Sequence, residues 1–160
     1  MFSILFRIIV VVVAVGRSNS EMLHLYKDVT KKCSRKKEIP VGAIIVDEFK
    51  NIISKGYNKV EEKNNPLYHA EKIAIDKALL KTNKRYLDNC DIWVTLQPCE
   101  MCMGMIRQVR IKRLYYGASI PHNSIKNKIN NRECSEIYSG IREDECSKLI
   151  KDFFKKIRSD

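Results

Sequence analysis

Proline, glycine and aromatic residues are scarce in this chain, and neither a low-complexity tract nor an internal repeat is present. There are 4 prolines and 6 glycines among 160 residues, and aromatic residues make up 8%. A chain of this composition is not expected to be extensively disordered. Because 44% of the residues are hydrophobic and the length is sufficient to bury a core, the sequence predicts one globular domain.

The chain also lacks an apolar run long enough to span a membrane. Its longest run, residues 8–15, is well short of the roughly 20 residues that a spanning helix needs, and it resembles the core of a signal peptide. The rest of the chain is typical of a cytosolic enzyme, so we expect no membrane partner and a cytoplasmic location. We expect residues 1–19 to be an extension outside the fold or the product of a misassigned start, with Met22 as the true start, and residues 20–160 to form the domain.

Nor do the 6 cysteines follow the pattern of a secreted disulfide framework. Cys99 and Cys102 form a C-x-x-C pair, while the others are scattered along the chain. This layout favours reduced thiols together with one metal-binding or redox pair. The scattered cysteines are Cys33, Cys90, Cys134 and Cys146.

Acidic residues are fewer than basic ones. The chain has 30 lysines and arginines but only 19 aspartates and glutamates, which gives a net charge of +11. Such a surplus attracts polyanions and makes nucleic acid a candidate partner, although a compositional bias toward lysine, asparagine and isoleucine would produce the same surplus. Candidate phosphate contacts fall in two groups, and a solvated basic face is the alternative for both. They are Arg107, Arg110, Lys112 and Arg113, and, near the C-terminus, Lys148, Lys151, Lys155 and Lys156.

The hydrophobic pattern predicts the order helix, two strands, helix, strand, helix, strand, helix. Alternation after the initial hairpin implies parallel pairing, so we expect an α/β fold in which helices cover both faces of a mixed sheet. The helix over residues 69–80 is apolar nearly all round, which is typical of a buried helix. The last helix has an apolar face that runs from Leu149 to Ile157. The predicted strands cover residues 41–46, 52–57, 91–96 and 113–117, and the other predicted helices begin at Ser20 and cover residues 99–109.

Three short segments could carry chemistry together: His69-Ala70-Glu71, Pro98-Cys99 and Cys102. Each is a weak signal alone, but the histidine and the first cysteine are both predicted to open a helix, so these side chains would face one crevice. Two cysteines three positions apart at the start of a helix lie one turn apart, and a metal and the helix dipole stabilise their thiolates. With one neutral histidine they form a three-ligand zinc site, whose open fourth position is typical of a catalytic centre.

Glu71 lies two residues beyond the histidine, where its carboxylate would sit beside the open position instead of on the metal. Zinc lowers the pKa of water held there, and a carboxylate can take up the proton and return it to the substrate. The alternatives are a redox pair and a closed structural zinc site. A closed site would need a fourth ligand. The candidates are Cys90, Cys134, Cys146 and His122, none of which has a recognisable spacing to the other three.

The pattern H-x-E…P-C-x-x-C is the signature of the zinc deaminases, and the wider sequence resembles the bacterial tRNA-specific adenosine deaminases. The resemblance covers most of residues 22–158, and its C-terminal part, with Phe153-Phe154, is the more family-specific one. It is carried by residues 38–46, 56–58, 69–75, 94–102, 116–118 and 137–154.

The resemblance implies a three-layer α/β/α sandwich of the cytidine-deaminase-like kind and a homodimer. It also implies conversion of the wobble adenosine of a tRNA anticodon loop to inosine, with release of ammonia. By the same resemblance, His69, Cys99 and Cys102 hold zinc, Glu71 shuttles protons and Asn58 hydrogen-bonds the base. A turn residue that closes the second strand is the alternative for Asn58.

Two other functions are compatible with these residues. One is deamination of a free nucleobase or nucleoside, such as guanine or cytosine, which uses the same catalytic residues. The other is a zinc-stabilised nucleic-acid-binding module without catalysis, which has no use for a non-ligating acid such as Glu71. The basic surplus and the C-terminal helix favour RNA, whereas the segment from Ser119 to Asn123 departs from the family pattern in a region that contributes to gripping the anticodon loop.

Overall fold

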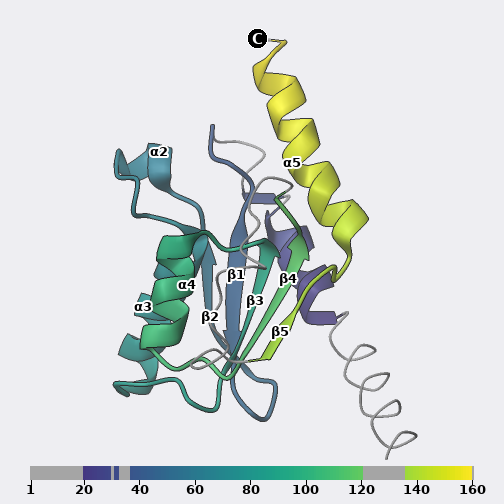
Figure 1. Cartoon of the computed structure of the whole chain (residues 1–160). Coiled ribbons are helices and arrows are strands. Elements are labelled where there is room, and N and C mark those ends of the chain that lie inside the picture. Colours follow the sequence, from purple (N-terminus) through teal and green to yellow (C-terminus); the bar gives the residue numbers. More distant parts are fainter. Residues whose placement is uncertain (1–19, 30, 33–36, 121–135, 160) are drawn as a thin grey trace, which may run out of the picture.

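A computed structural model describes residues 20–29, 31–32, 37–120 and 136–159 of the chain. In this part of the chain a 5-stranded sheet has the strand order β2-β1-β3-β4-β5 (Figure 1). A helical segment over residues 20–29 precedes the sheet. The strands are β1 (Gly42–Val46), β2 (Ile52–Tyr57), β3 (Asp91–Leu96), β4 (Arg113–Ala118) and β5 (Glu136–Tyr138), and the helices are α2 (Val60–Lys63), α3 (Ala70–Thr82), α4 (Glu100–Gln108) and α5 (Glu143–Ile157).

Strand β1 lies between two antiparallel neighbours. It pairs antiparallel with β2 and with β3, while β3 pairs parallel with β4, and β4 pairs parallel with β5. The sheet is therefore mixed, as predicted. The β1–β2 hairpin and strand β3, which covers residues 91–96, agree with the prediction from sequence.

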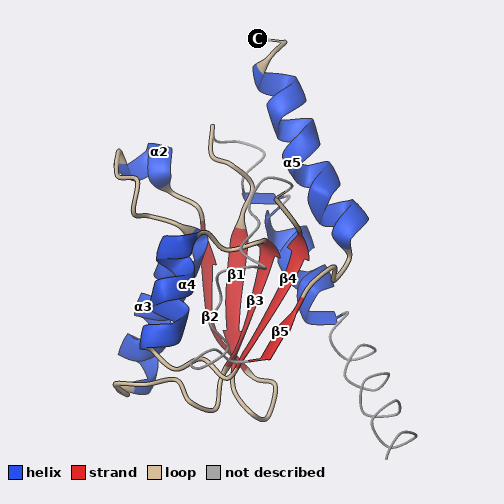
Figure 2. Cartoon of the chain, in the orientation of Figure 1, coloured by secondary structure: helices blue, strands red, loops and turns tan. Residues whose placement is uncertain are grey.

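Alternate side chains of the sheet enter two separate cores. Ile45 and Ile92 face α3 and α4, whereas Ile44 and Trp93 face the helical segment over residues 20–29 and the start of α5. Because successive side chains of a strand point to opposite faces, helices are needed on both sides to bury them. Figure 2 shows the sheet between these helices, which confirms the three-layer α/β/α sandwich.

Two short elements, α2 and β5, are not predicted from the sequence, and one predicted burial is wrong. Helix α3 buries one face only: Ala74 and Ala78 are completely buried, whereas Leu80 is 83% exposed. The helix packs on β1 and β2 along a single side. Its apolar circumference is therefore only partly buried.

Helix α5 is present as predicted, but only part of its apolar face is buried. Its first turns pack on the sheet through Cys146 and Leu149, but Phe154 and Ile157 are exposed. The rest of the helix extends beyond the end of the sheet (Figure 1). Its apolar face therefore contributes to the core only near its N-terminus.

The cysteines of the described residues are all free thiols, as predicted. Cys33 and Cys134, together with the N-terminal extension over residues 1–19, lie outside the described residues. No helix in the described part of the chain combines the length and the apolar character needed to cross a membrane.

Helix α3 approaches β2 so closely that one position accommodates only glycine. A Cβ atom at Gly56 would lie 2.0 Å from the carbonyl oxygen of Ala70 and 2.6 Å from the amide nitrogen of Ala74. Nearby, the Ser54 hydroxyl donates to the Ala74 carbonyl over 2.7 Å. These contacts set the height of the first turns of α3 above the sheet.

We expect Gly56→Ala to lower the free energy of unfolding by about 3 kcal/mol, because the added methyl group meets backbone atoms of α3 that cannot rotate away. Gly104→Ala is the matched control, since apart from its chain neighbours and the backbone of its own helix no atom lies within 4 Å of a Cβ there. Alanine favours a helix interior over glycine by up to about 1 kcal/mol. Urea denaturation of both variants checks the prediction, and equal stability of the two would contradict it.

Candidate active site

The histidine and cysteine segments each begin a helix. His69 is the N-cap residue of α3 and Cys99 is that of α4, with extended backbone angles of φ −71°, ψ 155° and φ −73°, ψ 172°. Their carbonyl groups accept hydrogen bonds from the amides of Ile73 and Met103, which start the two helices. Neither side chain caps its own helix, so both are available for other contacts.

These two side chains converge with that of Cys102, one turn further along α4. His69 Nδ1 lies 3.4 Å from the Cys102 sulfur and 3.7 Å from the Cys99 sulfur, and the three ligand atoms lie within 4.8 Å of one another. Tetrahedral zinc with ordinary bond lengths separates a sulfur and a nitrogen ligand by roughly 3.6 Å. The observed distances therefore fit that ion, with Nδ1 as the nitrogen that faces the sulfurs.

Burial sets the protonation of this group. It lowers the pKa of His69, which keeps the imidazole neutral and able to bind a metal. Burial also raises the pKa of the Cys102 thiol far above its usual value, and the negative charges of Glu71 and Cys99 add to this effect. A divalent cation among these groups would offset their mutual repulsion and bind the thiolates, so the donor set suits zinc.

Glu71 occupies the first turn of α3 and is 3% exposed. Burial raises its pKa to about 7, while hydrogen bonds with its own backbone N–H and with the Cys102 thiol act in the opposite direction. Its carboxyl group is not one of the three converging ligands found among the described residues. A carboxyl group whose pKa lies near neutrality can both accept and donate a proton, as general acid–base chemistry requires.

A cavity of about 290 Å³ opens over this group. Its volume is near the lower limit of roughly 300 Å³ for ligand pockets, so it suits a small ring compound. Besides the site residues, it is lined by Val41, Val60, Leu96 and Gln97. A larger cavity of about 410 Å³ lies around the β1–β2 turn, at the end of β1 and β2 that is opposite to the smaller cavity. None of the predicted site residues lines it. We therefore assign the chemistry to the smaller cavity.

Asn58 follows β2 and lines this cavity. Its backbone N–H donates to the Val41 carbonyl at 3.0 Å, and its side-chain Nδ2 donates to Glu38 Oε2 at 3.0 Å. Glu38 is itself 2% exposed. Sequence reasoning assigns no role to Glu38, for which the one signal is a charged residue shortly before a strand that is buried throughout.

Two cysteines considered as fourth zinc ligands lie elsewhere. Cys146 packs in the core on the other face of the sheet, where its sulfur would be 2.4 Å from a Cβ atom at Gly117, and Cys90 lines the larger cavity. His122 and Cys134 lie outside the described residues. Among the residues that the structure describes, the three converging residues could hold a metal ion together, and a tetrahedral ion held by three residues has one position open for a reactant.

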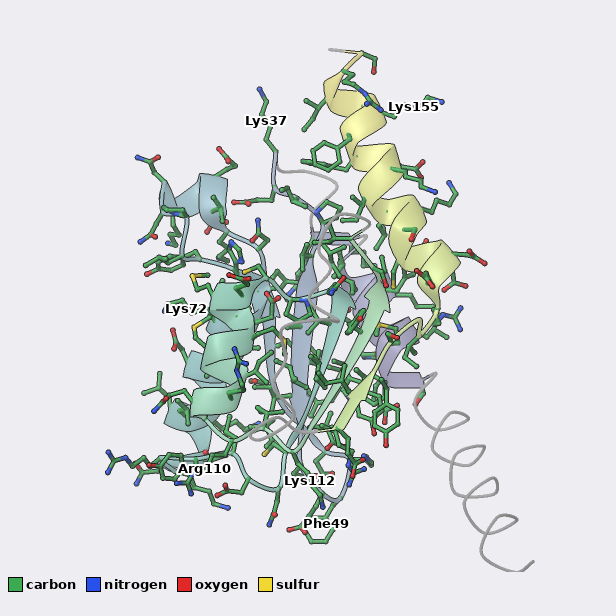
Figure 3. The ribbon with its side chains drawn as sticks, viewed as in Figure 1. Lys37, Phe49, Lys72, Arg110, Lys112 and Lys155 are labelled. Atoms are coloured by element: carbon green, nitrogen blue, oxygen red, sulfur yellow. The ribbon has the colours of Figure 1, made fainter. Side chains whose placement is uncertain are left out.

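The candidate phosphate contacts around residue 110 lie away from this site. Figure 3 shows Arg110 and Lys112 at one end of the molecule and Lys155 at the other. The former residues follow the C-terminal end of α4, whereas the site lies at its N-terminal end. Arg113 is 3.6 Å from the buried carboxylate of Asp91, so it is engaged within the fold.

Residues 17–118 match the family model of the cytidine and deoxycytidylate deaminase zinc-binding region. This range includes the three converging ligands and Glu71. The fold and the site thus define a deaminase with a zinc-binding region.

The chain is 50% identical to the tRNA-specific adenosine deaminase of Rickettsia bellii over 131 residues, which cover 77% of this chain and 90% of that protein. It therefore belongs, among the cytidine and deoxycytidylate deaminases, to the family of tRNA-specific adenosine deaminases.

Solved structures agree with this assignment. One, from a study of A-to-I editing by tRNA:A34 deaminases at the wobble position, is 28% identical with a TM-score of 0.73 and covers 81% of this chain and 99% of its own. The guanine deaminase from Nitrosomonas europaea is 19% identical with a TM-score of 0.73, covering 84% of this chain and 83% of its own. The second likeness concerns the fold alone.

Proposed function

We propose that the protein is a zinc-dependent hydrolase that converts adenosine to inosine at the wobble position of a tRNA anticodon loop and releases ammonia. The observation that carries this proposal is the convergence of His69, Cys99 and Cys102 beside a small cavity, which His69, Cys99 and the buried Glu71 line. Membership of the tRNA-specific adenosine deaminases supports the choice of substrate.

In this proposal His69, Cys99 and Cys102 hold zinc, which when bound supplies the positive charge that makes water a nucleophile near neutral pH. Glu71 takes a proton from the attacking water and transfers it to the leaving amino group. Because burial raises its pKa to about 7, the carboxyl group can perform both transfers near neutrality. Asn58 hydrogen-bonds the base and orients it over these groups.

The size of the cavity determines how a nucleic acid would present its base. About 290 Å³ is suited to one small ring compound, such as a single base. Enzymes that act on a base turn its nucleotide out of the stack, which costs least where the base is already unpaired. The loop of an anticodon stem-loop meets this requirement.

The remaining parts of the proposal concern the domain and its assembly. We propose that residues 20–160 form the catalytic domain, and the complete burial of Met22, Leu25 and Val29 in the core supports its N-terminal limit. The resemblance to the bacterial family supports a homodimer that acts in the cytoplasm.

We expect the protein to hold one zinc ion per chain and to lose most of it in Cys99→Ala or Cys102→Ala, because each change removes one of three protein ligands. Cys90→Ala is the control, since it removes a free thiol outside the ligand set. Elemental analysis after dialysis measures the metal. Full zinc occupancy in either ligand variant would refute the assignment.

The function is tested by measuring ammonia in separate reactions with anticodon stem-loop RNA, guanine and cytosine. We expect release from the RNA alone, and a fall in kcat of roughly 10²-fold or more for Glu71→Gln, which keeps the shape but cannot accept a proton. Asp76→Asn, which changes an exposed carboxylate on the same helix, should retain activity. Ammonia from guanine or cytosine but not from RNA would overturn the tRNA assignment in favour of free-base deamination.

Lys155 and Lys156 are exposed lysines on α5 and are candidate phosphate contacts at the end of the molecule away from Arg110. Each contact with single-stranded RNA contributes about −0.7 to the slope of log affinity against log salt. We therefore expect Lys155→Gln combined with Lys156→Gln to reduce that slope, measured from KM for the stem-loop, by about 1.4. Arg110→Gln combined with Lys112→Gln removes the same charge and should leave the slope unchanged. Identical slopes for wild type and the α5 variant would exclude RNA binding through these lysines.

A further inference from the structure

Glu38 is a buried carboxylate in the lining of the cavity, and its hydrogen bonds connect Asn58, which follows β2, with Glu62 in α2. Its Oε2 accepts from Asn58 Nδ2 at 3.0 Å, and its Oε1 accepts from the backbone N–H of Glu62 at 2.7 Å. The side chain is 2% exposed, and a buried charge is costly unless it is hydrogen-bonded. Both oxygens are engaged by groups that donate.

A carboxylate can only accept hydrogen bonds, so Glu38 selects one of the two orientations of the Asn58 amide. Nδ2 must face Glu38, and within the described residues the carbonyl oxygen Oδ1 of Asn58 has no hydrogen-bond partner. Asn58 lines the cavity together with His69 and Glu71. This oxygen is therefore an acceptor available to a base in the cavity.

We infer that Glu38 is a positioning residue, which holds the Asn58 amide in the orientation that presents a hydrogen-bond acceptor to the base. The inference rests on the proposed function, in which Asn58 contacts the base. Glu38→Gln would keep the shape of the side chain but would place an N–H donor against Asn58. Only Oδ1 could accept from that donor, so the Asn58 amide would turn over and present N–H groups to the base.

A purely structural role for Glu38 makes a different prediction. The hydrogen bond to Glu62 anchors α2, and that helix contributes Val60 and Glu61 to the cavity. If this anchor were the whole role, Glu38→Gln would have little effect, because the amide oxygen can still accept from the Glu62 N–H. The effect would also be independent of residue 58.

A double-mutant cycle between Glu38→Gln and Asn58→Asp distinguishes the two roles, with kcat/KM on the stem-loop and the Tm of the zinc-loaded proteins as readouts. Asn58→Asp alone places two carboxylates against each other, so we expect kcat/KM to fall by roughly 100-fold and the Tm to fall with it. Glu38→Gln alone should lower kcat/KM by about tenfold. In the combined variant the amide at position 38 donates to the carboxylate at position 58, whose other oxygen still accepts. We expect kcat/KM of this variant to be roughly tenfold or more above that of Asn58→Asp alone, and its Tm to be higher as well.

Asp91→Asn is the control for the loss of a buried carboxylate. Asp91 is 3% exposed and binds Lys50 at the opposite end of the sheet, so its combination with Asn58→Asp should give no recovery. If the wild type is active and the Glu38→Gln, Asn58→Asp variant is no better than Asn58→Asp, the inference is overturned. A wild type inactive on the stem-loop would count against the proposed function instead. In that case the Tm of the combined variant would still show whether Glu38 and Asn58 are paired. If that Tm were no higher than the Tm of Asn58→Asp alone, the inference would be overturned as well.

Discussion

The direction of β1 relative to its neighbours is the constraint on which the site depends. Because β1 is antiparallel to both β2 and β3, these two strands run the same way and end at the same edge of the sheet. Helix α3 follows β2 in the chain and α4 follows β3, and each of these helices begins with a predicted metal ligand, His69 or Cys99. The two side chains meet because the two strand ends meet, which is also why small molecules bind to open α/β sheets at the carboxyl ends of the strands.

Close packing then turns this meeting point into a site with altered acid–base properties. Gly56 lets the backbone of α3 lie against β2, and Glu71 in the first turn of that helix is buried as a result. Burial in these surroundings raises the pKa of Glu71 to about 7. The same carboxyl group on an exposed helix would titrate near its ordinary value. The packing that stabilises the fold is therefore also what brings the pKa of this acid near neutrality.

Two buried carboxylates at opposite ends of the sheet have different surroundings and different consequences. Asp91 lies 2.7 Å from Lys50 and 3.6 Å from Arg113, so cations balance its charge and its role is structural. Glu38 is held by the amide of Asn58 and by a backbone N–H. Neutral donors satisfy a carboxylate only when they are oriented toward it, so Glu38 determines which way the Asn58 amide points.

The sequence by itself determined the features that depend on neighbours along the chain. The buried strand over residues 91–96 and the convergence of His69, Cys99 and Cys102 were predictable, because an apolar run or a spacing of one helical turn at a helix start is a local pattern. Only the tertiary structure decided that Glu38 holds Asn58, that Leu80 faces solvent and that the basic residues after α4 lie at the opposite end of that helix from the site. The short strand β5 is exposed throughout and carries no apolar pattern. These features depend on strand direction and on which face of each element meets another layer, and no local spacing encodes either.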